Sequence, residues 1–384
     1  MTLPLRLFRG LITSLAFTCS VQAGPAASPG DVALRHDIQV LADYGAIRGP
    51  VTTWPVAWDA VLANLEHVRD NDVILPNRVL PTFERVLARA QHEAARGRSG
   101  FRALVAVAEA PTNIRGFADT PREEAEIRAG ISWFGEHISL DLNVAAVDNP
   151  ADGEDVRADG SQIAVDLGNW TIGASTYDRW WGPGWDGSLI LSNNARPIPS
   201  LVIGRNLTNA FETKWLSWLG PWDLQVMFGQ LERDSFTTDK RFWGMRLNFR
   251  PVRGFELGVS RTATFCGEGR PCDMSTFWNM LRGRDNASDD GISYENEPGN
   301  QMAGFDARWT NMWFGTPLSL YGQFIGDDEA GGLPSRYLAL FGLEVSGISR
   351  GQTSWRWFAE AASTSCDALK NPVLFDCAYR YSPS

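Results

Sequence analysis

Residues Trp243–Arg250 read Trp-Gly-Met-Arg-Leu-Asn-Phe-Arg, and the alternation of apolar and polar side chains in this stretch decides the fold. Successive side chains of a β-strand point to opposite sides of the sheet, so a period of two predicts a strand with one apolar face. The other face carries Arg246, Asn248 and Arg250. Full positive charges on one strand face suit the wet lumen of a barrel.

The same alternation recurs along the chain, with turns rich in Gly, Pro, Asp and Asn between the runs. The clearest runs are Phe101–Val107, Ile163–Leu167, Trp222–Phe228, Phe305–Trp309, Tyr337–Leu343 and Trp355–Glu360. A soluble sandwich or propeller would show this pattern as well. Charges such as Arg308 on the polar face, aromatic strand ends such as Phe242, and the lack of a blade-length repeat favour a barrel. We therefore predict a mainly β chain whose residues 98–384 form an antiparallel transmembrane β-barrel.

The first part of the chain, residues 1–23, has the layout of an export signal. Arg6 and Arg9 precede the apolar run Leu11–Val21, and Ala23 ends a small-residue cleavage site. The signal contains no acidic residue, so its removal makes the mature chain more acidic than the formal charge of −10. An acidic exported chain is a poor candidate for binding nucleic acid. No later segment has the roughly 20 consecutive apolar residues of a membrane-spanning helix.

Residues 24–97 have a helical period and predict a small unit of three helices. Leu34, Ile38 and Leu41 lie on one face of the first helix. Proline is favoured in the first helical turn, so Pro55 is expected to open the second helix and Pro81 the third. The apolar faces of these two helices are predicted to contain Val61, Leu62, Leu65, Val86, Leu87 and Ala90.

Four cysteines follow the export signal, and an even number predicts two disulfides in an oxidising compartment. Three pairings are possible, and the spacings favour Cys266 with Cys272 and Cys366 with Cys377. Metal ligation is less favoured because there is no Cys-x-x-Cys pair and the four histidines are scattered. We therefore expect no metal and no other cofactor.

The segment Arg179–Arg205 is the candidate binding site, because it sets three tryptophans among glycines and polar side chains. Sugar rings stack on aromatic faces while their hydroxyls need hydrogen-bond partners. The candidate polysaccharide-binding residues are Arg179, Trp180, Trp181, Trp185, Asp186, Asn193, Asn194 and Arg196. Two other interpretations remain open: the indoles could fill a loop-covered core, or they could lie at a membrane interface.

Catalysis is not expected. The chain has no Gly-x-Ser-x-Gly elbow, no His-Glu-x-x-His pair and no phosphate-binding loop. A glycosidase needs only two carboxylates in one cleft, so the sequence does not exclude Asp178 or Asp186 from that role. Acidic residues beside tryptophans are also common in sugar-binding sites without chemistry, and we predict that the chain is not an enzyme.

Two segments resemble the Wzi family of capsule-assembly outer-membrane proteins. One is Leu34–Gly45, Leu-Arg-His-Asp-Ile-Gln-Val-Leu-Ala-Asp-Tyr-Gly, continued by Ile47–Pro55. The other is Arg179–Asp186, Arg-Trp-Trp-Gly-Pro-Gly-Trp-Asp, continued by Leu191–Pro197. The resemblance implies an outer-membrane β-barrel with a helical bundle on its periplasmic side, acting as a lectin-like anchor for capsular polysaccharide. It implies no catalysis.

The resemblance also raises a question about the C-terminus. Family members continue for several strands beyond a motif like Cys377-Ala378-Tyr379, whereas this sequence stops at Ser384. We expect a C-terminally truncated barrel; a smaller closed barrel and an open, nonfunctional one are the alternatives. A barrel cannot leave an unpaired strand edge in lipid.

The sequence thus predicts a bacterial outer-membrane protein whose partners are capsular or extracellular polysaccharide and outer-membrane lipid. The alternative function is a diffusion channel for saccharides or other small solutes, which would need an open lumen. The tryptophan-rich segment could instead fold into the barrel and plug it, while outer loops contact the polymer. Loop tips carry function more often than the scaffold does.

Overall fold

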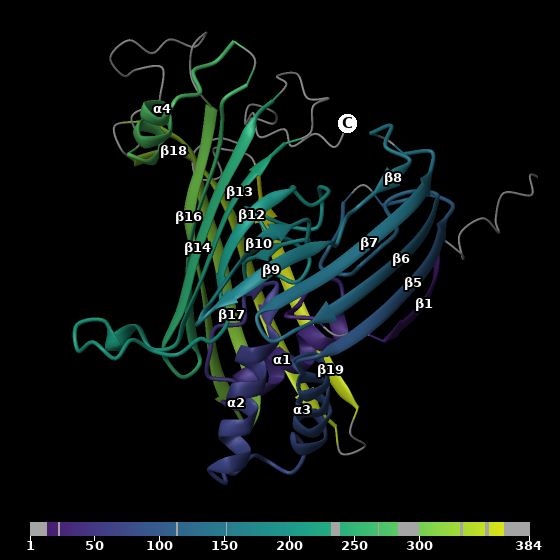
Figure 1. The fold of residues 1–384 in the computed structure, drawn as a ribbon. Helices are drawn as coiled ribbons and strands as arrows, with labels where there is room; N and C mark the ends of the chain where they lie inside the picture. The colour runs from purple at the N-terminus through teal and green to yellow at the C-terminus, as the bar shows by residue number, and fades with distance from the viewer. Residues whose placement is uncertain are drawn as a thin grey trace, which may run out of the picture.

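The chain forms one curved antiparallel sheet, and three N-terminal helices lie at one end of it, the first of them inside the curve (Figure 1). This computed structural model describes residues 14–21, 24–112, 114–150, 152–231, 239–267, 269–282, 299–330, 333–349 and 353–364. Within them the large sheet has 15 strands, joined antiparallel in the order β1-β5-β6-β7-β9-β10-β12-β13-β14-β15-β16-β17-β18-β19, with β8 on β7.

The strands of this wall are long, and each pairs mainly with its neighbours in sequence. They are β1 (Ser14–Val21), β5 (Arg98–Ala108), β6 (Ala125–Phe134), β7 (Ile138–Asp148), β8 (Val156–Arg157), β9 (Gln162–Leu167), β10 (Trp170–Ser175), β12 (Ser200–Arg205), β13 (Trp222–Gln230), β14 (Arg241–Val252), β15 (Phe255–Phe265), β16 (Gly299–Trp313), β17 (Thr316–Ala330), β18 (Leu333–Ile348) and β19 (Ser354–Ser363). Two short pairs lie inside the wall: β2 (Ala26–Ala27) with β4 (Val56–Ala57), and β3 (Thr53–Trp54) with β11 (Trp180–Trp181).

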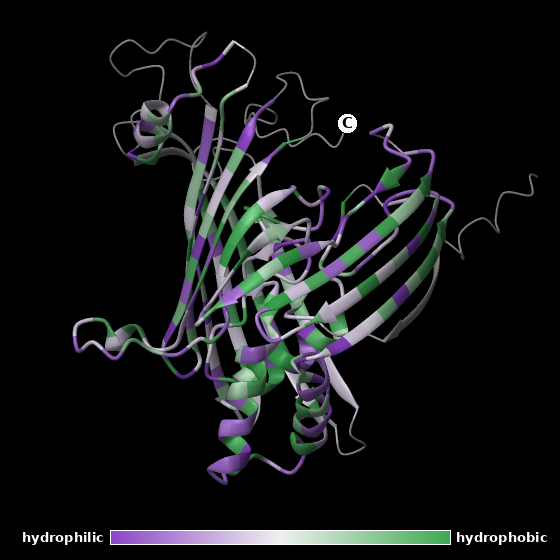
Figure 2. Cartoon of the chain, viewed as in Figure 1, coloured by the Kyte–Doolittle hydropathy of each residue, from purple (hydrophilic) through white to green (hydrophobic). Residues whose placement is uncertain are grey.

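Hydrophobic and hydrophilic residues alternate along the strands (Figure 2), and the burial pattern assigns the apolar set to the outer face of the wall and the polar set to its inner face. Ile163, Leu167 and Phe305 are exposed on the outside, as lipid-facing side chains are. Arg246 and Arg308 point inward and are buried. The predicted fold class, a mainly β chain with an antiparallel barrel wall and an N-terminal helical unit, is confirmed.

The wall is open in the described residues, because its two end strands, β1 and β19, do not pair with each other. Strand β1 lies within the predicted export signal, and here it pairs along its whole length with β5, from Ser14 opposite Ala108 to Val21 opposite Phe101. Cleavage of the signal stays a prediction.

The helical unit consists of α1 (Val32–Asp43), α2 (Trp58–Asp70) and α3 (Leu80–Glu93). Pro81 lies in the first turn of α3, as predicted. The expectation that Pro55 opens the second helix is wrong, because α2 begins at Trp58. Residues 53–57 stay extended instead, since β3 pairs with β11 and β4 pairs with β2.

Helix α1 lies inside the wall, and this explains why nearly all its side chains are buried. Arg308 of β16 binds the Asp43 carboxylate at 2.6 and 3.0 Å. Arg250 of β14 donates to the carbonyls of Ala42, Ile47 and Gly49, just where the helix ends and leaves its last carbonyls without helical partners. The inward-facing arginines therefore hold an inserted helix and loop in a filled lumen.

The two ends of the wall differ in the length of their connections. At the end where the helices lie, called here the helical end, most turns are short: 135–137, 168–169, 253–254 and 314–315, with 206–221 the longer exception. At the opposite end, called the loop end, most connections are long: 109–124, 149–161, 176–199, 231–240 and 266–298, with 331–332 the short exception. Outer-membrane barrels have short periplasmic turns and long outer loops.

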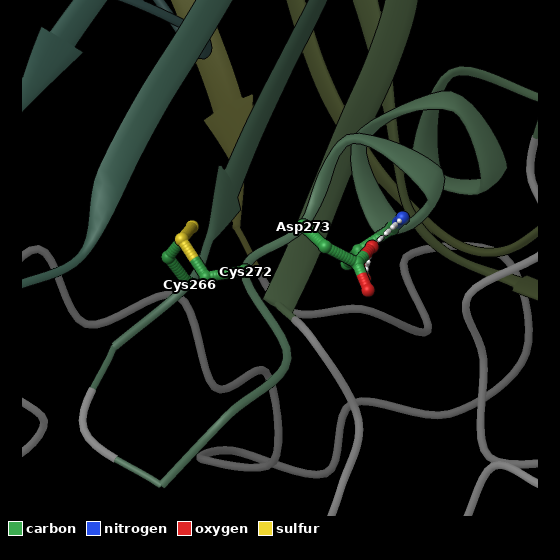
Figure 3. Close-up of a disulfide and its surroundings, with 4 residues drawn as sticks. Cys266, Cys272 and Asp273 are labelled. Atoms are coloured by element: carbon green, nitrogen blue, oxygen red, sulfur yellow. Dashed lines mark hydrogen bonds between the residues drawn. A yellow bond between two sulfur atoms is a disulfide. The ribbon is translucent and has the colours of Figure 1, made fainter.

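A fourth helix, α4 (Met274–Leu281), lies beside the upper strand ends at the loop end (Figure 1). The predicted disulfide between Cys266 and Cys272 is confirmed just before it, and Asp273 caps its first turn (Figure 3). The second predicted disulfide, between Cys366 and Cys377, lies outside the described residues. Of the helices that are described, none is long and apolar enough to cross a membrane.

Candidate functional site

The tryptophan-rich segment enters the lumen from the loop end and meets the helical unit inside the wall. It leaves β10 after Ser175 and returns to β12 at Ser200. On the way, β11 pairs with β3, so that Trp180 lies opposite Trp54 and Trp181 opposite Thr53. Residues 44–57 and 176–199, which enter from opposite ends, therefore form one body, called here the plug.

Trp180 is completely buried in an aromatic cluster drawn from three loops. Phe117, from the connection 109–124, packs edge-on against Trp54 at 5.1 Å and against Trp180 at 5.5 Å between ring centroids. The Trp180 indole donates to the Gly184 carbonyl at 3.0 Å. Burial of aromatic rings with satisfied N–H groups is strongly stabilising.

Trp185 is 6% exposed and is contacted by two arginines. The guanidinium carbons of Arg35, on α1, and Arg356, on β19, lie 4.2 and 4.0 Å from the Trp185 ring centroid. Its indole donates to Glu344 of β18. Arg35 also donates to the carbonyl of Gly184 at 2.6 Å, and burial together with Arg356 lowers the pKa of Arg35 to about 9. Trp185 thus joins α1 to the last described strands.

Trp181 is completely buried as well, and the wall binds its backbone. Gln323 of β17 donates to the Trp181 carbonyl and accepts from the Leu189 amide, both at 2.8 Å. Two strands away in the wall, one carboxylate oxygen of Glu256 on β15 accepts from the amides of Val51 and Thr52, both at 2.9 Å. These bonds fix the plug in the lumen.

The other candidate residues of the segment do not form one patch. Asn193 is buried and donates to the Phe117 carbonyl at 2.9 Å, whereas Asp186 and Asn194 are exposed. Arg196 is half-buried and bonds to carboxylates of the 149–161 connection; the closest contacts are Asp152 and Glu154, both at 2.7 Å, and Asp159 at 3.0 Å.

Arg179 lies apart from these residues, on the wall of a partly open pocket between the helical unit and strands β9 to β13. Burial lowers its pKa to about 10. Other polar residues on the pocket wall include Gln162, Thr171, Asn206, Asp223 and Gln225. No group of His, Cys, Asp or Glu side chains within the described ranges is placed to hold a metal ion.

Ion pairs connect the polar side chains of the loops at the loop end. The outer loop surface, defined as the described residues of 109–124, 152–161 and 176–199, is cross-linked by ion pairs. Arg122 binds Asp178 at 3.1 Å, and Arg157 bridges Glu123 and Asp152, both at 2.7 Å. Burial raises the pKa of the Asp178 carboxyl, and Arg122 opposes that shift. These bonds join three loops into a firm polar floor above the plug.

Comparison with known proteins identifies the family. The family model described as capsule assembly protein Wzi matches residues 95–381. The chain belongs to the Wzi capsule assembly family. A relative from Klebsiella pneumoniae, described as an uncharacterized 55.8 kDa protein in the cps region, is 32% identical over 359 residues, which are 92% of this chain and 68% of that protein.

A solved structure of a Wzi family member is also similar. It is Wzi from Escherichia coli, described as an outer membrane protein involved in group 1 capsule assembly and a carbohydrate binding β-barrel. The match has a TM-score of 0.75 and 28% sequence identity, and covers 91% of this chain and 74% of that chain. The predicted family and outer-membrane location of this Wzi family protein are confirmed.

Several residues that organise the site in this Wzi family protein were not singled out from the sequence. Arg35, Phe117 and Arg356 contact the tryptophans, yet they lie on a helix, a loop and a distant strand. The sequence did contain one signal for such contacts, namely a charged residue on the inner face of a predicted strand, such as Glu344. Buried charges need partners, so such residues point to an inserted segment.

Proposed function

We propose that this protein holds capsular polysaccharide at the cell surface, with the outer loop surface as the contact region and the plug as its support. The carrying observation is that three tryptophans of the candidate segment are buried while its polar residues Asp186 and Asn194 are exposed at the loop end. Sugar hydroxyls both donate and accept hydrogen bonds, so a floor of carboxylates, amides and guanidinium groups suits them.

The connections of the wall support an orientation. Long connections lie at the loop end and mostly short turns at the helical end, which favours the loop end as the side that faces the cell exterior. The outer loop surface then faces the capsule, and α1 to α3 face the periplasm. The carbohydrate binding described for the Escherichia coli structure is in line with this assignment.

The filled lumen favours an anchor over a diffusion channel. Trp54, Trp180 and Trp181 have no exposed surface, and Arg246 is equally buried between wall and plug. A solute would have to displace hydrogen-bonded backbone and close-packed rings to pass. We therefore expect no stable conductance from the folded protein in planar bilayers, and steady ion-conducting steps would favour the channel.

Capsule retention tests the proposed contact region. The double variant Asp186→Ala/Asn194→Ala changes exposed side chains of the outer loop surface, so we expect the barrel to fold normally and cell-bound polysaccharide to fall, with a matching rise in the medium. The matched control, Asp70→Ala/Asn71→Ala, removes the same two side-chain types at the exposed end of α2. Equal retention in both variants and in the wild type would refute the outer loop surface as the contact region.

The buried tryptophans call for a separate measurement. Trp181→Ala is expected to reduce the amount of heat-resistant folded barrel, because the indole packs between the plug and the wall. If this variant folds fully and loses only polymer binding, Trp181 is a stacking platform and our assignment of the plug as support is wrong.

A further inference from the structure

Helix α4 covers the outer face of the wall, on the side that faces lipid. Ala263 and Phe265 belong to the same outward face of β15 as the exposed Val259, yet they are buried. Met280 and Phe277 of α4 pack over them. Phe228 of β13 extends this cluster, with ring centroids 5.7 Å from Phe265 and 6.3 Å from Phe277. The helix therefore lies outside the barrel and away from the lumen.

The exposed stripe of α4 combines apolar and cationic side chains. Met274 is 69% exposed and Trp278 is 52% exposed, and Arg282 follows at the same spacing of four residues. Residues four apart lie on one helix face. A tryptophan beside a cation on a helix along a membrane surface is typical of an interfacial helix.

Further basic residues surround the helix. Arg261 reaches from β15 to the end of α4 and donates to the carbonyls of Met280 and Leu281, at 2.8 and 2.9 Å. Lys240 precedes β14, and burial together with the nearby Arg270 lowers its pKa. Arg241 is exposed next to it.

The nearby acidic groups in the described residues are already engaged. One oxygen of Asp273 accepts from the Thr276 amide and the Ser275 hydroxyl, both at 2.7 Å, as the N-cap of α4. Asp239 accepts from the Gln230 amide at 3.3 Å. The described surroundings of α4 thus carry more basic than acidic side chains.

We propose that α4 and its basic neighbours form a lateral docking site for an outer-leaflet lipid with a phosphorylated headgroup. Lys240, Arg241 and Arg282 face the phosphate, and Met274 and Trp278 enter the boundary between headgroups and acyl chains. The lipid is favoured over the capsular polymer because α4 lies on the lipid side of the wall and continues its apolar outer face.

The test measures lipid retention by the purified full-length protein. Native mass spectrometry in detergent would follow the binding of bisphosphorylated lipid A and of its dephosphorylated form. Each basic residue near an anionic membrane surface contributes on the order of one kilocalorie per mole, so Lys240→Gln/Arg282→Gln is expected to weaken lipid A binding about 30-fold. The dephosphorylated lipid should bind weakly to the wild type and the variant alike.

A matched control removes the same charges at the other end. Lys214→Gln/Arg98→Gln likewise replaces one lysine and one arginine, both exposed and near the helical end, and should leave lipid A binding unchanged. Equal loss in both double variants, or none in either, would overturn the proposal.

The apolar part of the site is tested with Trp278→Ser, because about half of the Trp278 side chain is exposed. We expect lipid A binding to fall while heat-resistant folded barrel stays at the wild-type amount. If Trp278→Ser and Lys240→Gln/Arg282→Gln instead reduce capsule retention with lipid A binding intact, α4 contacts polymer and the lipid assignment is wrong.

Discussion

The ion pair between Arg246 of β14 and Asp306 of β16 gives a quantitative test of the filled lumen. Arg246 donates to the two carboxylate oxygens of Asp306 at 2.6 and 3.0 Å, and also to Thr53 of the plug at 2.6 Å. Neither side chain is exposed by more than 2%. In a water-filled lumen, either partner could be removed at little cost, because water would solvate the remaining charge.

In a filled lumen the result is different. Arg246→Met leaves the Asp306 carboxylate buried without its cation, which typically costs about 3–5 kcal/mol. The double variant Arg246→Met/Asp306→Leu removes both charges and should cost no more than either single variant. We expect this order of unfolding free energies when the protein is unfolded by urea in detergent micelles. The folded fraction is measured by the heat-dependent shift of the folded barrel on gels.

The matched control is the ion pair of Arg69 with Asp70 on α2, in which both side chains are about half exposed. Exposed pairs contribute about 0–1 kcal/mol, so Arg69→Met should change the free energy of unfolding little. If Arg246→Met costs less than about 1 kcal/mol, in the range of an exposed pair, or if the double variant costs the sum of its two singles, the packed lumen described above is wrong.

Three further predictions concern α1, the plug and α4. Burial and Arg356 lower the pKa of His36 to about 4, below its ordinary value of 6.5. As the pH falls, His36 of the unfolded chain therefore binds a proton before His36 of the folded chain does. The free energy of unfolding should fall as the pH drops from about 6.5 towards 4, by about 2 kcal/mol at pH 5. His36→Gln should remove this pH dependence of the urea midpoint. Trp181→Ala should cost about 3–5 kcal/mol in the same assay, and an unchanged midpoint would contradict its packing. Asp273→Ala removes the N-cap of α4 and should cost that helix about 1 kcal/mol, seen as faster hydrogen exchange at the Thr276 amide, whereas unchanged exchange would mean that the cap is not needed.

The wall could be predicted from the sequence because its pattern is local. The alternation in Trp243–Arg250 depends only on the direction of successive side chains, and the structure has it in the predicted phase. The prediction that Pro55 opens a helix was wrong because β3 pairs with β11 and β4 pairs with β2. This strand pairing overrides the preference of proline for the first turn of a helix. Such pairing is not visible in a local window.

The site could be predicted in its location but not in its contacts. Composition alone cannot tell an indole that stacks on a sugar from one that stacks on an arginine, because both partners favour the same aromatic face. Arg35 and Arg356, which contact Trp185, lie far from it in the chain. The local disulfide between Cys266 and Cys272 could be predicted because the short spacing itself favours the pair.

The contact between His36 and Arg356 has a consequence for the order of assembly. Arg356 on the last described strand donates to the His36 ring of the first helix at 3.1 Å, and the same arginine contacts Trp185. The N-terminal helix is translated early, yet it obtains these partners only when β19 has joined the wall. The last of the contacts that fix this helix therefore forms only after the strands β14 and β16, which bind its C-terminal end through Arg250 and Arg308, are already in place.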